Sequence, residues 1–303
     1  MLENWKYSIA AGVLMAVVTP HASAYHHTIT MEEPFMPTSP VLKDAALTLE
    51  GRVAVLTFKR NDVRNALSGT ELVPDIVATL AWANSASDVS VLILTGEGSA
   101  FSAGGNIKIM GERAKAPAFE LQQSYRRTIQ RIPFALQEAE IPVIAAVNGP
   151  AIGAGFDLAN MCDIRIGSTR AQFGETFANL GIIAGDGGAW FLQRLLGYQR
   201  AAELTFTGRI VKAEEARQLG ILLEVTEPDA LLARTRALAE TIAAKPPLAV
   251  RYAKRLLKLA QQQPLSEHLE LCSSYQALCH KTEDHAEALA AFFAKRPGTF
   301  KGC

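Results

Sequence analysis

Two carboxylates and several glycines stand close together in residues 173–190, FGETFANLGIIAGDGGAW. Carboxylates transfer protons in enzymes when they lie within hydrogen-bond reach of a substrate. Glu175 lies early in this segment, and Asp186 lies between glycines near its end. A third carboxylate, Asp157, ends the short stretch GAGFD. These three side chains are therefore the candidates for acid and base chemistry.

Each of these carboxylates also has a structural explanation that needs no chemistry. An acid in the first turn of a helix, as expected for Asp157, stabilises the helix dipole. Asp186 precedes Gly187 and fits a helix N-cap, and Glu175 fits an acid that faces solvent. We predict Asp157 and Asp186 as the catalytic groups. Glu175 is kept as a third candidate, because it lies two residues before Phe177 and would share its face of a strand.

Two segments that run from strand to turn to helix must position these groups. Residues 92–110 read LILTGEGSAFSAGGNIKIM, and residues 143–165 read VIAAVNGPAIGAGFDLANMCDIR. Small residues in each turn let a ligand approach the backbone. Free N–H groups at the start of a helix can hydrogen-bond a developing oxyanion. If the two turns converge, they can polarise an acyl carbonyl, such as that of a thioester, and stabilise an enolate.

Other motifs in the first of these turns are incomplete. GEGSAF has Phe101 where the dinucleotide-binding fingerprint has its third glycine, and no G-x-x-x-x-G-K-[ST] phosphate loop occurs. AFSAG resembles the G-x-S-x-G turn of hydrolases, but Ala100 replaces its first glycine. We therefore interpret Ser102 as a small loop residue rather than a nucleophile.

The order of the expected elements indicates an α/β layered domain. Alternating apolar and polar residues predict a hairpin over 46–58. Ser68 is the expected N-cap of the first helix. Strand, helix and strand in repetition favour layers of helices on a sheet. Short β-branched runs predict buried strands at residues 89–96, 141–149 and 163–168, and helices are predicted at 69–84 and 119–139.

Helices dominate the sequence after Gly185, where the strand signal nearly vanishes apart from residues 221–226. The last helix has Thr282 as its expected cap. We expect a helical C-terminal part that makes oligomer contacts. Its helices are predicted at residues 228–244, 247–262, 265–281 and 283–294.

Seven stretches, in this order, make the sequence resemble the crotonase family of enoyl-CoA hydratases and isomerases. The resemblance covers residues 46–302 and implies the crotonase (ClpP-like) fold, with repeated ββα units and a helical C-terminal subdomain. It divides the chain into a core over 46–225 and an oligomerisation subdomain over 226–303. The stretches are RNALS (64–68), AFSAGGNIKIM (100–110), IPVIAAVNGPAIGAGFDLANMCDIRI (141–166), AQFGETFANLGI (171–182), GGAWFLQRLLG (187–197), AAELTFTGRIVKAEEARQLGIL (201–222) and FFAKRPGTFKG (292–302).

The resemblance implies a binding site for an acyl-CoA thioester. It assigns the oxyanion hole to the backbone N–H groups of Ala103 and Ala154. Ala154 stands where many members have glycine, which matters little if only the N–H is needed. Lys295 is expected to approach the CoA phosphates from the same or a neighbouring subunit. The residues implied along the CoA path are Arg64, Ala66, Leu67, Gly104, Gly105, Asn106 and Ile107.

The resemblance leaves the identity of the acid and base open. Hydratases of this family hold one water between two glutamates; the first position here is Asp157 and the second is Phe177, which cannot transfer a proton. Several isomerases and dehalogenases have an acid at the position of Gly185, and this chain has Asp186 one residue later. Double-bond isomerisation is therefore at least as well favoured as hydration. Two alternatives remain: hydrolysis of a thioester or carbon–carbon bond, and acyl-CoA binding without turnover.

Composition argues against several classes of partner. Thirty Lys and Arg balance thirty Asp and Glu, which removes the electrostatic reason to expect a nucleic acid or membrane surface. The cysteines form no CxxC pair, and Cys272 and Cys279 on one helix would lie roughly 10 Å apart, beyond disulfide reach. We expect reduced cysteines, no metal and no cofactor besides the CoA of the substrate. By resemblance, the chain is expected to form a homotrimer or a dimer of trimers.

The N-terminal residues carry an ambiguous signal. Residues 7–18 are apolar and HASAY at 21–25 resembles a cleavage site, so residues 1–25 form either an upstream extension or an export signal. The apolar run is too short to span a membrane comfortably. Residues 26–45 contain three prolines and are expected to form a flexible arm. We predict a cytoplasmic enzyme, because CoA thioesters are intracellular.

Overall fold

A mixed sheet forms the centre of the computed structural model, which describes residues 38–113 and 115–303. Its six strands lie in the order β1-β2-β3-β4-β6-β9. The first pair is antiparallel and the other neighbouring pairs are parallel. The strands are β1 (Ala45–Glu50), β2 (Val53–Phe58), β3 (Val91–Gly96), β4 (Val143–Val147), β6 (Ile164–Ser168) and β9 (Glu224–Thr226).

The predicted hairpin and buried strands are confirmed. Glu50 pairs with Val53, and Gly51 in the turn between them has a φ of 57°, which glycine adopts without a steric penalty. All residues of β4 are buried, as expected for a strand covered on both faces.

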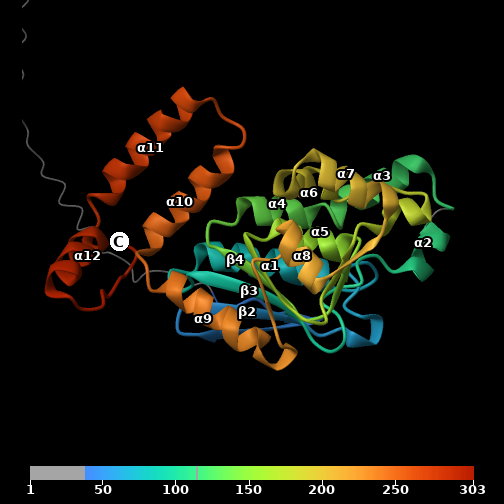
Figure 1. Ribbon diagram of the computed structural model, residues 1–303, viewed down its shortest axis with the longest axis horizontal. Helices are drawn as coiled ribbons and strands as arrows, with labels where there is room; N and C mark the ends of the chain where they lie inside the picture. The colour runs from blue at the N-terminus through green and yellow to red at the C-terminus, as the bar shows by residue number, and fades with distance from the viewer. Residues whose placement is uncertain (1–37, 114) are drawn as a thin grey trace, which may run out of the picture. The chain divides into compact units, whose positions relative to one another are not determined.

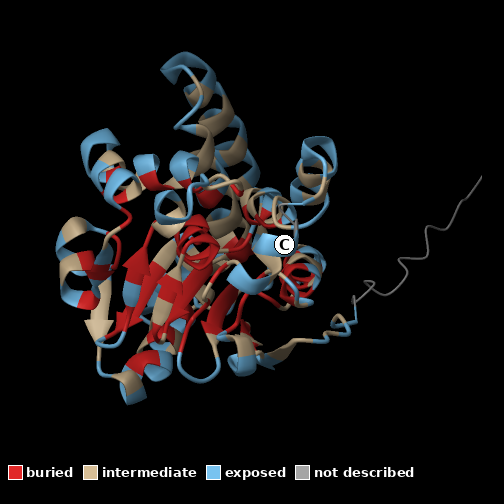
Figure 2. Ribbon diagram, turned by 90° about the vertical axis from the view of Figure 1, so that its right-hand side faces the viewer, coloured by how far each residue is buried: buried red, intermediate tan, exposed pale blue. Residues whose placement is uncertain are grey.

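Helices cover both faces of this sheet (Figure 1). Helix α9 (Leu231–Ala243) packs on one face, where Leu231 joins a core cluster with Val55 and Ile93. Helices α1 (Leu72–Ser85) and α5 (Ala154–Met161) contribute to the larger core on the other face. Figure 2 shows the strands buried between these helical layers. The α/β class is therefore confirmed.

A second, three-stranded sheet was not predicted. It consists of β5 (Pro150–Ile152), β7 (Gln172–Gly174) and β8 (Ile210–Lys212). Strands of three residues leave too little periodicity to be recognised in a sequence. An isolated bridge between Ser102 and Ala151 joins the turn after β3 to this sheet. The second sheet therefore helps to hold the two glycine-containing turns together.

The single helix predicted over 119–139 is wrong, because the chain forms two helices there. They are α3 (Ala118–Arg127) and α4 (Arg131–Glu138). Pro133 lies in the first turn of α4, where its missing N–H costs nothing, although the same ring would break a continuous helix. The remaining short helices are η1 (Asn61–Val63), α2 (Ile107–Arg113), η2 (Thr176–Leu180), α6 (Gly188–Leu196), α7 (Tyr198–Thr207), α8 (Ala213–Leu219) and η3 (Pro228–Ala230).

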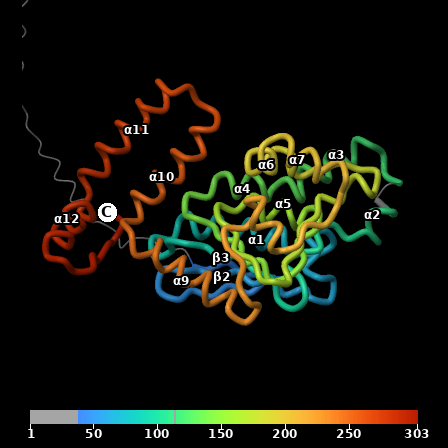
Figure 3. Tube along the Cα trace, in the orientation of Figure 1, coloured from blue at the N-terminus to red at the C-terminus, as the bar shows by residue number. Residues whose placement is uncertain are grey.

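The C-terminal helices differ in how they contact the core. The oligomerisation subdomain predicted over 226–303 includes α9, but the structure packs α9 on the central sheet. Helix α10 (Pro247–Leu259) is held by Lys254, which donates to the carbonyl of Ile141 at 2.6 Å. Helices α11 (Leu265–Cys279) and α12 (Glu283–Ala294) follow, and α10 and α11 lie side by side (Figure 3). The predicted cap of α12 is confirmed, because the Thr282 hydroxyl accepts the N–H of His285 at 3.1 Å.

Two further expectations concern the termini and the cysteines. The predictions for residues 1–25 and for most of the arm lie outside the described residues. Within residues 38–113 and 115–303, no helix is long and apolar enough to cross a membrane. All four cysteines are free thiols, as predicted.

Candidate active site

A cavity of about 1000 Å³ opens beside the two glycine-containing turns. Its wall includes residues from the turn after β3, from α3, from η2 and from the loop before α6. The structure thus brings together segments that are far apart in the sequence. The predicted site residues on the cavity wall are Leu67, Gly104, Gly105, Asn106, Ile107, Ala154 and Asp186.

Three residues that the resemblance assigned to CoA binding are not part of this wall. Arg64 is exposed and has a φ of 51°, and the side chain of Ala66 is buried in the core. Lys295 ends α12 in a left-handed conformation, with a φ of 53°, and is exposed. Within one chain, Lys295 therefore does not reach the cavity.

The backbone N–H of Ala103 is not available to a ligand. It donates to the carbonyl of Arg64 at 2.9 Å, so the structure contradicts its assignment to the oxyanion hole. The N–H of Gly105, two residues later, finds no acceptor among the residues that the structure describes. Because Gly105 also lines the cavity, its N–H is the better candidate. Sequence matching finds such a turn but does not tell which of its peptide N–H groups faces the ligand.

The backbone N–H of Ala154, the second predicted oxyanion donor, lies at the start of a helix beside the cavity. Ala154 is the first residue of α5 and lines the cavity, so its N–H has no partner within the helix and carries the positive end of the dipole. A Cβ atom added to Gly104 would lie 2.9 Å from this nitrogen. The two turns therefore converge. The positive φ of 53° falls on Gly153 rather than on Ala154, which explains why alanine is accepted here.

Asn65, within the RNALS stretch, fixes the position of the first turn. It is buried with a φ of 53°. Its amide donates to the carbonyls of Glu97 at 3.1 Å and Ala100 at 2.9 Å, and accepts the N–H of Arg60 at 2.9 Å. Leu67 also holds this turn, because its N–H donates to the carbonyl of Gly104 at 2.7 Å. RNALS is therefore a support for the site.

Two serines in this region have structural roles. The Ser68 hydroxyl accepts the N–H of Asn106 at 2.6 Å, while α1 begins after Glu71, so the prediction of Ser68 as a helix cap is wrong. Ser102 is fully buried, and its hydroxyl donates to the carbonyl of Asn65 at 2.7 Å. This geometry agrees with the interpretation of Ser102 as a loop residue.

Asp157, Glu175 and Asp186 form one cluster of carboxyl groups. Their side chains are 0%, 1% and 5% exposed, respectively. Asp186 lies on the cavity wall, whereas Asp157 and Glu175 lie behind it. Asp157 has both of the others as neighbours close enough for a hydrogen bond between carboxyl groups, which forms only when one of the two groups carries a proton. The cluster also abuts α6, since a Cβ atom added to Gly188 would lie 2.2 Å from Oδ1 of Asp157.

Burial raises the pKa of all three carboxyl groups. The pKa of Asp157 is raised well above its usual range by burial and then by the charges of Asp186 and Glu175. Burial raises the pKa of Glu175 to about 7. Burial also raises the pKa of Asp186, although hydrogen bonds from Asp157 and from the N–H groups of Asp186 and Gly188 oppose this rise. Asp186 is therefore the group best suited to be ionised, and Asp157 the group best suited to hold a proton.

Phe177 occupies the cavity wall beside Ala154. Its ring packs over Gly153, where an added Cβ atom would lie 3.5 Å from it. An aromatic ring neither accepts nor donates a proton at this position. The site therefore lacks a carboxylate at the second position where hydratases of the resembling family have a glutamate.

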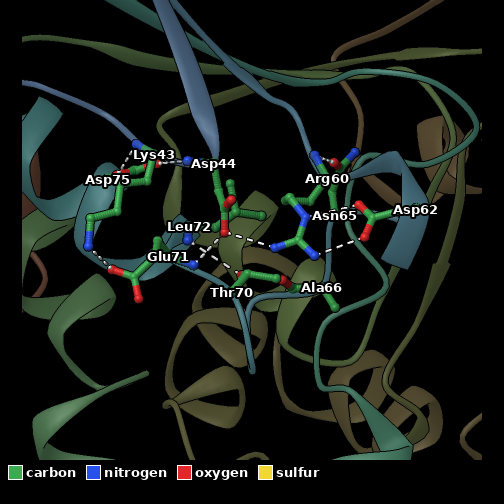
Figure 4. A network of polar contacts seen from close by, with 10 residues as sticks. All are labelled: Lys43, Asp44, Arg60, Asp62, Asn65, Ala66, Thr70, Glu71, Leu72 and Asp75. Atoms are coloured by element: carbon green, nitrogen blue, oxygen red, sulfur yellow. Dashed lines mark hydrogen bonds and ion pairs between the residues drawn. The ribbon is translucent and has the colours of Figure 1, made fainter.

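Charged groups at another part of the cavity wall are largely paired with one another (Figure 4). The N–H of Asp44 donates to the carboxylate of Asp75 at 2.7 Å, and the carboxylate of Asp44 pairs with Arg60 at 3.0 Å. Residues at the end of the predicted arm are thereby tied to α1. Among the described residues, Arg127 and Arg131 are the cations on the wall without a carboxylate partner.

The carboxyl cluster does not have the arrangement of a metal site. Within the described part of the chain, no group of three or more His, Cys, Asp or Glu side chains is placed to hold a metal ion.

Comparison with known proteins gives matches over most of the chain. A model of the enoyl-CoA hydratase/isomerase family matches residues 48–303. The short-chain-enoyl-CoA hydratase of Clostridium acetobutylicum is 36% identical over 256 residues, which cover 84% of this chain and 96% of that protein. The 2,3-dehydroadipyl-CoA hydratase of Escherichia coli is 33% identical over 261 residues, which cover 86% of this chain and 100% of that protein. The crystal structure of enoyl-CoA hydratase from Bacillus anthracis, 33% identical, aligns with a TM-score of 0.79 over 86% of this chain and 100% of that one.

Proposed function

Because the chain belongs to the enoyl-CoA hydratase/isomerase family, we propose that it moves the double bond of an enoyl-CoA thioester held in the cavity. Its α/β architecture is the crotonase fold of its structural relatives. The observation that carries the proposal is the placement of Asp186 on the same wall as the N–H groups of Gly105 and Ala154. A base and two oxyanion donors then face one ligand.

The proposed reaction begins with the thioester oxygen accepting hydrogen bonds from Gly105 and Ala154. These donors stabilise the negative charge that develops on the oxygen as the enolate forms. The Asp186 carboxylate takes a proton from the acyl chain, and the electron pair of the broken C–H bond passes into the enolate. The same group returns a proton to a different carbon, so the double bond shifts and the mass is unchanged. Arg127 and Arg131 are available to an anionic part of the ligand.

Phe177 favours isomerisation over hydration. Hydration requires a water molecule held by groups that deliver its proton and its hydroxide. With Phe177 on the wall, the second group that positions this water in the hydratases of the family is missing. Asp157 and Asp186 suffice for proton transfer along the acyl chain, which needs no water.

Incubation with 2-enoyl-, 3-enoyl- and dienoyl-CoA followed by mass spectrometry tests this proposal. We expect a shifted double bond, exchange of acyl protons with deuterated solvent and no gain of water. Rapid hydration of crotonyl-CoA as the main reaction would contradict isomerisation. Release of free thiol would identify a hydrolase, and binding without any product would identify a non-catalytic acyl-CoA-binding protein.

Replacing Phe177 should change the balance between the two reactions. In Phe177→Glu a carboxylate would stand beside Ala154, at the place of the missing water-holding group. We expect the hydration rate to rise by at least about tenfold, within the range that one added proton-transferring group supplies. Phe177→Leu is the control, because it removes the ring without adding a carboxylate. Equal hydration by both variants would show that Phe177 does not decide the reaction.

We further propose that the chain forms a homotrimer or a dimer of trimers through its C-terminal helices. Large apolar side chains there are exposed, including Leu257 at 73%, Phe292 at 76% and Phe293 at 77%. The rings of Phe292 and Phe293 lie 5.7 Å apart, and exposed apolar side chains that cluster in this way commonly mark an interface. Lys295 follows these residues and could reach the cavity of a neighbouring copy. Sedimentation equilibrium should give a mass equal to a multiple of three chains. The double variant Phe292→Asp, Phe293→Asp should contain fewer chains per particle. A monomeric wild type would contradict the proposal.

The cytoplasmic location stays a prediction that rests on the CoA substrate. N-terminal sequencing of the protein from its cells tests it. Cleavage that leaves Tyr25 as the first residue would contradict it and identify the 24 residues before Tyr25 as an export signal.

A further inference from the structure

We propose that Glu175 is a positioning residue that directs the proton of Asp157 toward Asp186. The proposal rests on the proposed function and concerns a group that this function does not use. Glu175 lies directly after β7 and is 1% exposed. It is not on the cavity wall, so it acts through Asp157 rather than on the substrate.

The geometry requires protons inside the cluster. Both carboxyl oxygens of Asp157 and both of Glu175 lack a hydrogen-bond donor within the described part of the chain. Nevertheless, Asp157 touches both Glu175 and Asp186. Two carboxyl groups form a hydrogen bond only when one of them carries a proton. Asp157, in the middle, therefore either donates its own proton or accepts that of a neighbour.

One proton on Asp157 cannot serve both neighbours at once. If Glu175 is ionised, it competes with Asp186 for the Asp157 proton. If Glu175 is protonated, it donates to Asp157, and Asp157 donates to Asp186. In this second arrangement Asp186 is the one ionised group, and it faces the cavity. Asp186 is ionised in both arrangements, but only protonated Glu175 leaves the Asp157 hydrogen bond on Asp186, where it holds the carboxylate of the base in place.

No other charged group opposes this arrangement. The charges that act on Asp157 are those of Asp186, from the loop before α6, and Glu175, from the end of β7. Charged side chains on the neighbouring elements are exposed, namely Arg131 and Glu138 of α4, Arg194 of α6 and Lys212 of β8. The protonation of each carboxyl group in the cluster is therefore determined by the other two carboxyl groups.

The pH dependence of isomerisation tests this role. The pKa of Glu175 is raised to about 7, so kcat/KM of the wild type should fall above that pH, by up to about tenfold per pH unit, as Glu175 loses its proton. Glu175→Gln supplies a permanent donor and should remove this fall while leaving the rate at pH 6 within about threefold. Glu138→Gln, the same change on an exposed side chain, should keep the wild-type profile. An alkaline fall that persists in Glu175→Gln would overturn the proposal.

Infrared spectroscopy of the free enzyme gives a second readout that needs no turnover. The C=O band of protonated carboxyl groups should lose intensity between pH 6 and pH 9 in the wild type, and this loss should be absent in Glu175→Gln. An unchanged loss in the variant would show that Glu175 is not the titrating group. If the wild type neither isomerises nor exchanges acyl protons, the proposed function fails, whereas the infrared result still decides whether Glu175 holds the proton.

Discussion

Asp186→Asn is expected to lower the rate of isomerisation by about 10²- to 10⁴-fold, the range that a positioned acid or base contributes. Asp186 is the member of the carboxyl cluster on the cavity wall. Asparagine keeps nearly the same shape but does not take a proton from carbon. Binding of an acyl-CoA should change little, because the N–H groups of Gly105 and Ala154 remain. Single-turnover kinetics and an equilibrium binding measurement separate the two effects.

Two further variants serve as a comparison and a control for this experiment. Asp157→Asn should cost less than Asp186→Asn, because Asp157 lies behind the wall and acts through its hydrogen bond to Asp186. Asp229→Asn, an identical change on an exposed side chain, should leave the rate unchanged. Should Asp186→Asn exchange acyl protons with solvent as fast as the wild type, the base lies elsewhere and Asp157 becomes the first candidate.

The central sheet was predictable because its signals are local. The β4 run is apolar throughout and buried throughout, and the hairpin turn contains the glycine that its positive φ favours. The break between α3 and α4 was readable in principle, since Pro133 stands where a continuous helix would need a backbone donor. Strands β5, β7 and β8 were not readable, because each has three residues and depends on partners far along the chain.

The sequence named several residues that the structure places on the cavity wall, but not how they are arranged around it. The sequence pointed to all three carboxylates and predicted Asp157 and Asp186 alike as catalytic groups, whereas the structure puts Asp186 on the wall and Asp157 behind it. A residue's type and spacing do not tell whether a side chain reaches a cavity or supports one that does. The same limit applies to Ala103 and Gly105: both lie in one turn, and only the hydrogen bond from Ala103 to Arg64 shows which N–H is already engaged.

Gly104→Ala is expected to cause the second large loss, because Gly104 is where the two turns touch. An added Cβ atom would lie 2.3 Å from the carbonyl oxygen of Ile152 and 2.9 Å from the nitrogen of Ala154. Both are backbone atoms, so the turns must move apart. The donors of Gly105 and Ala154 would then no longer point at one oxygen, and kcat should fall by about 10²- to 10³-fold, as after loss of an oxyanion donor.

Backbone strain must be separated from this displacement. Gly104 has a φ of 72°, and an alanine in that left-handed region costs about 1–2 kcal/mol of stability wherever it occurs. Gly220→Ala is the matched control, because Gly220 has a φ of 88° and nothing lies within 4 Å of an added Cβ. Both variants should lose thermal stability, whereas only Gly104→Ala should lose kcat. A Gly104→Ala enzyme with full kcat would show that the convergence of the two turns is not what stabilises the enolate.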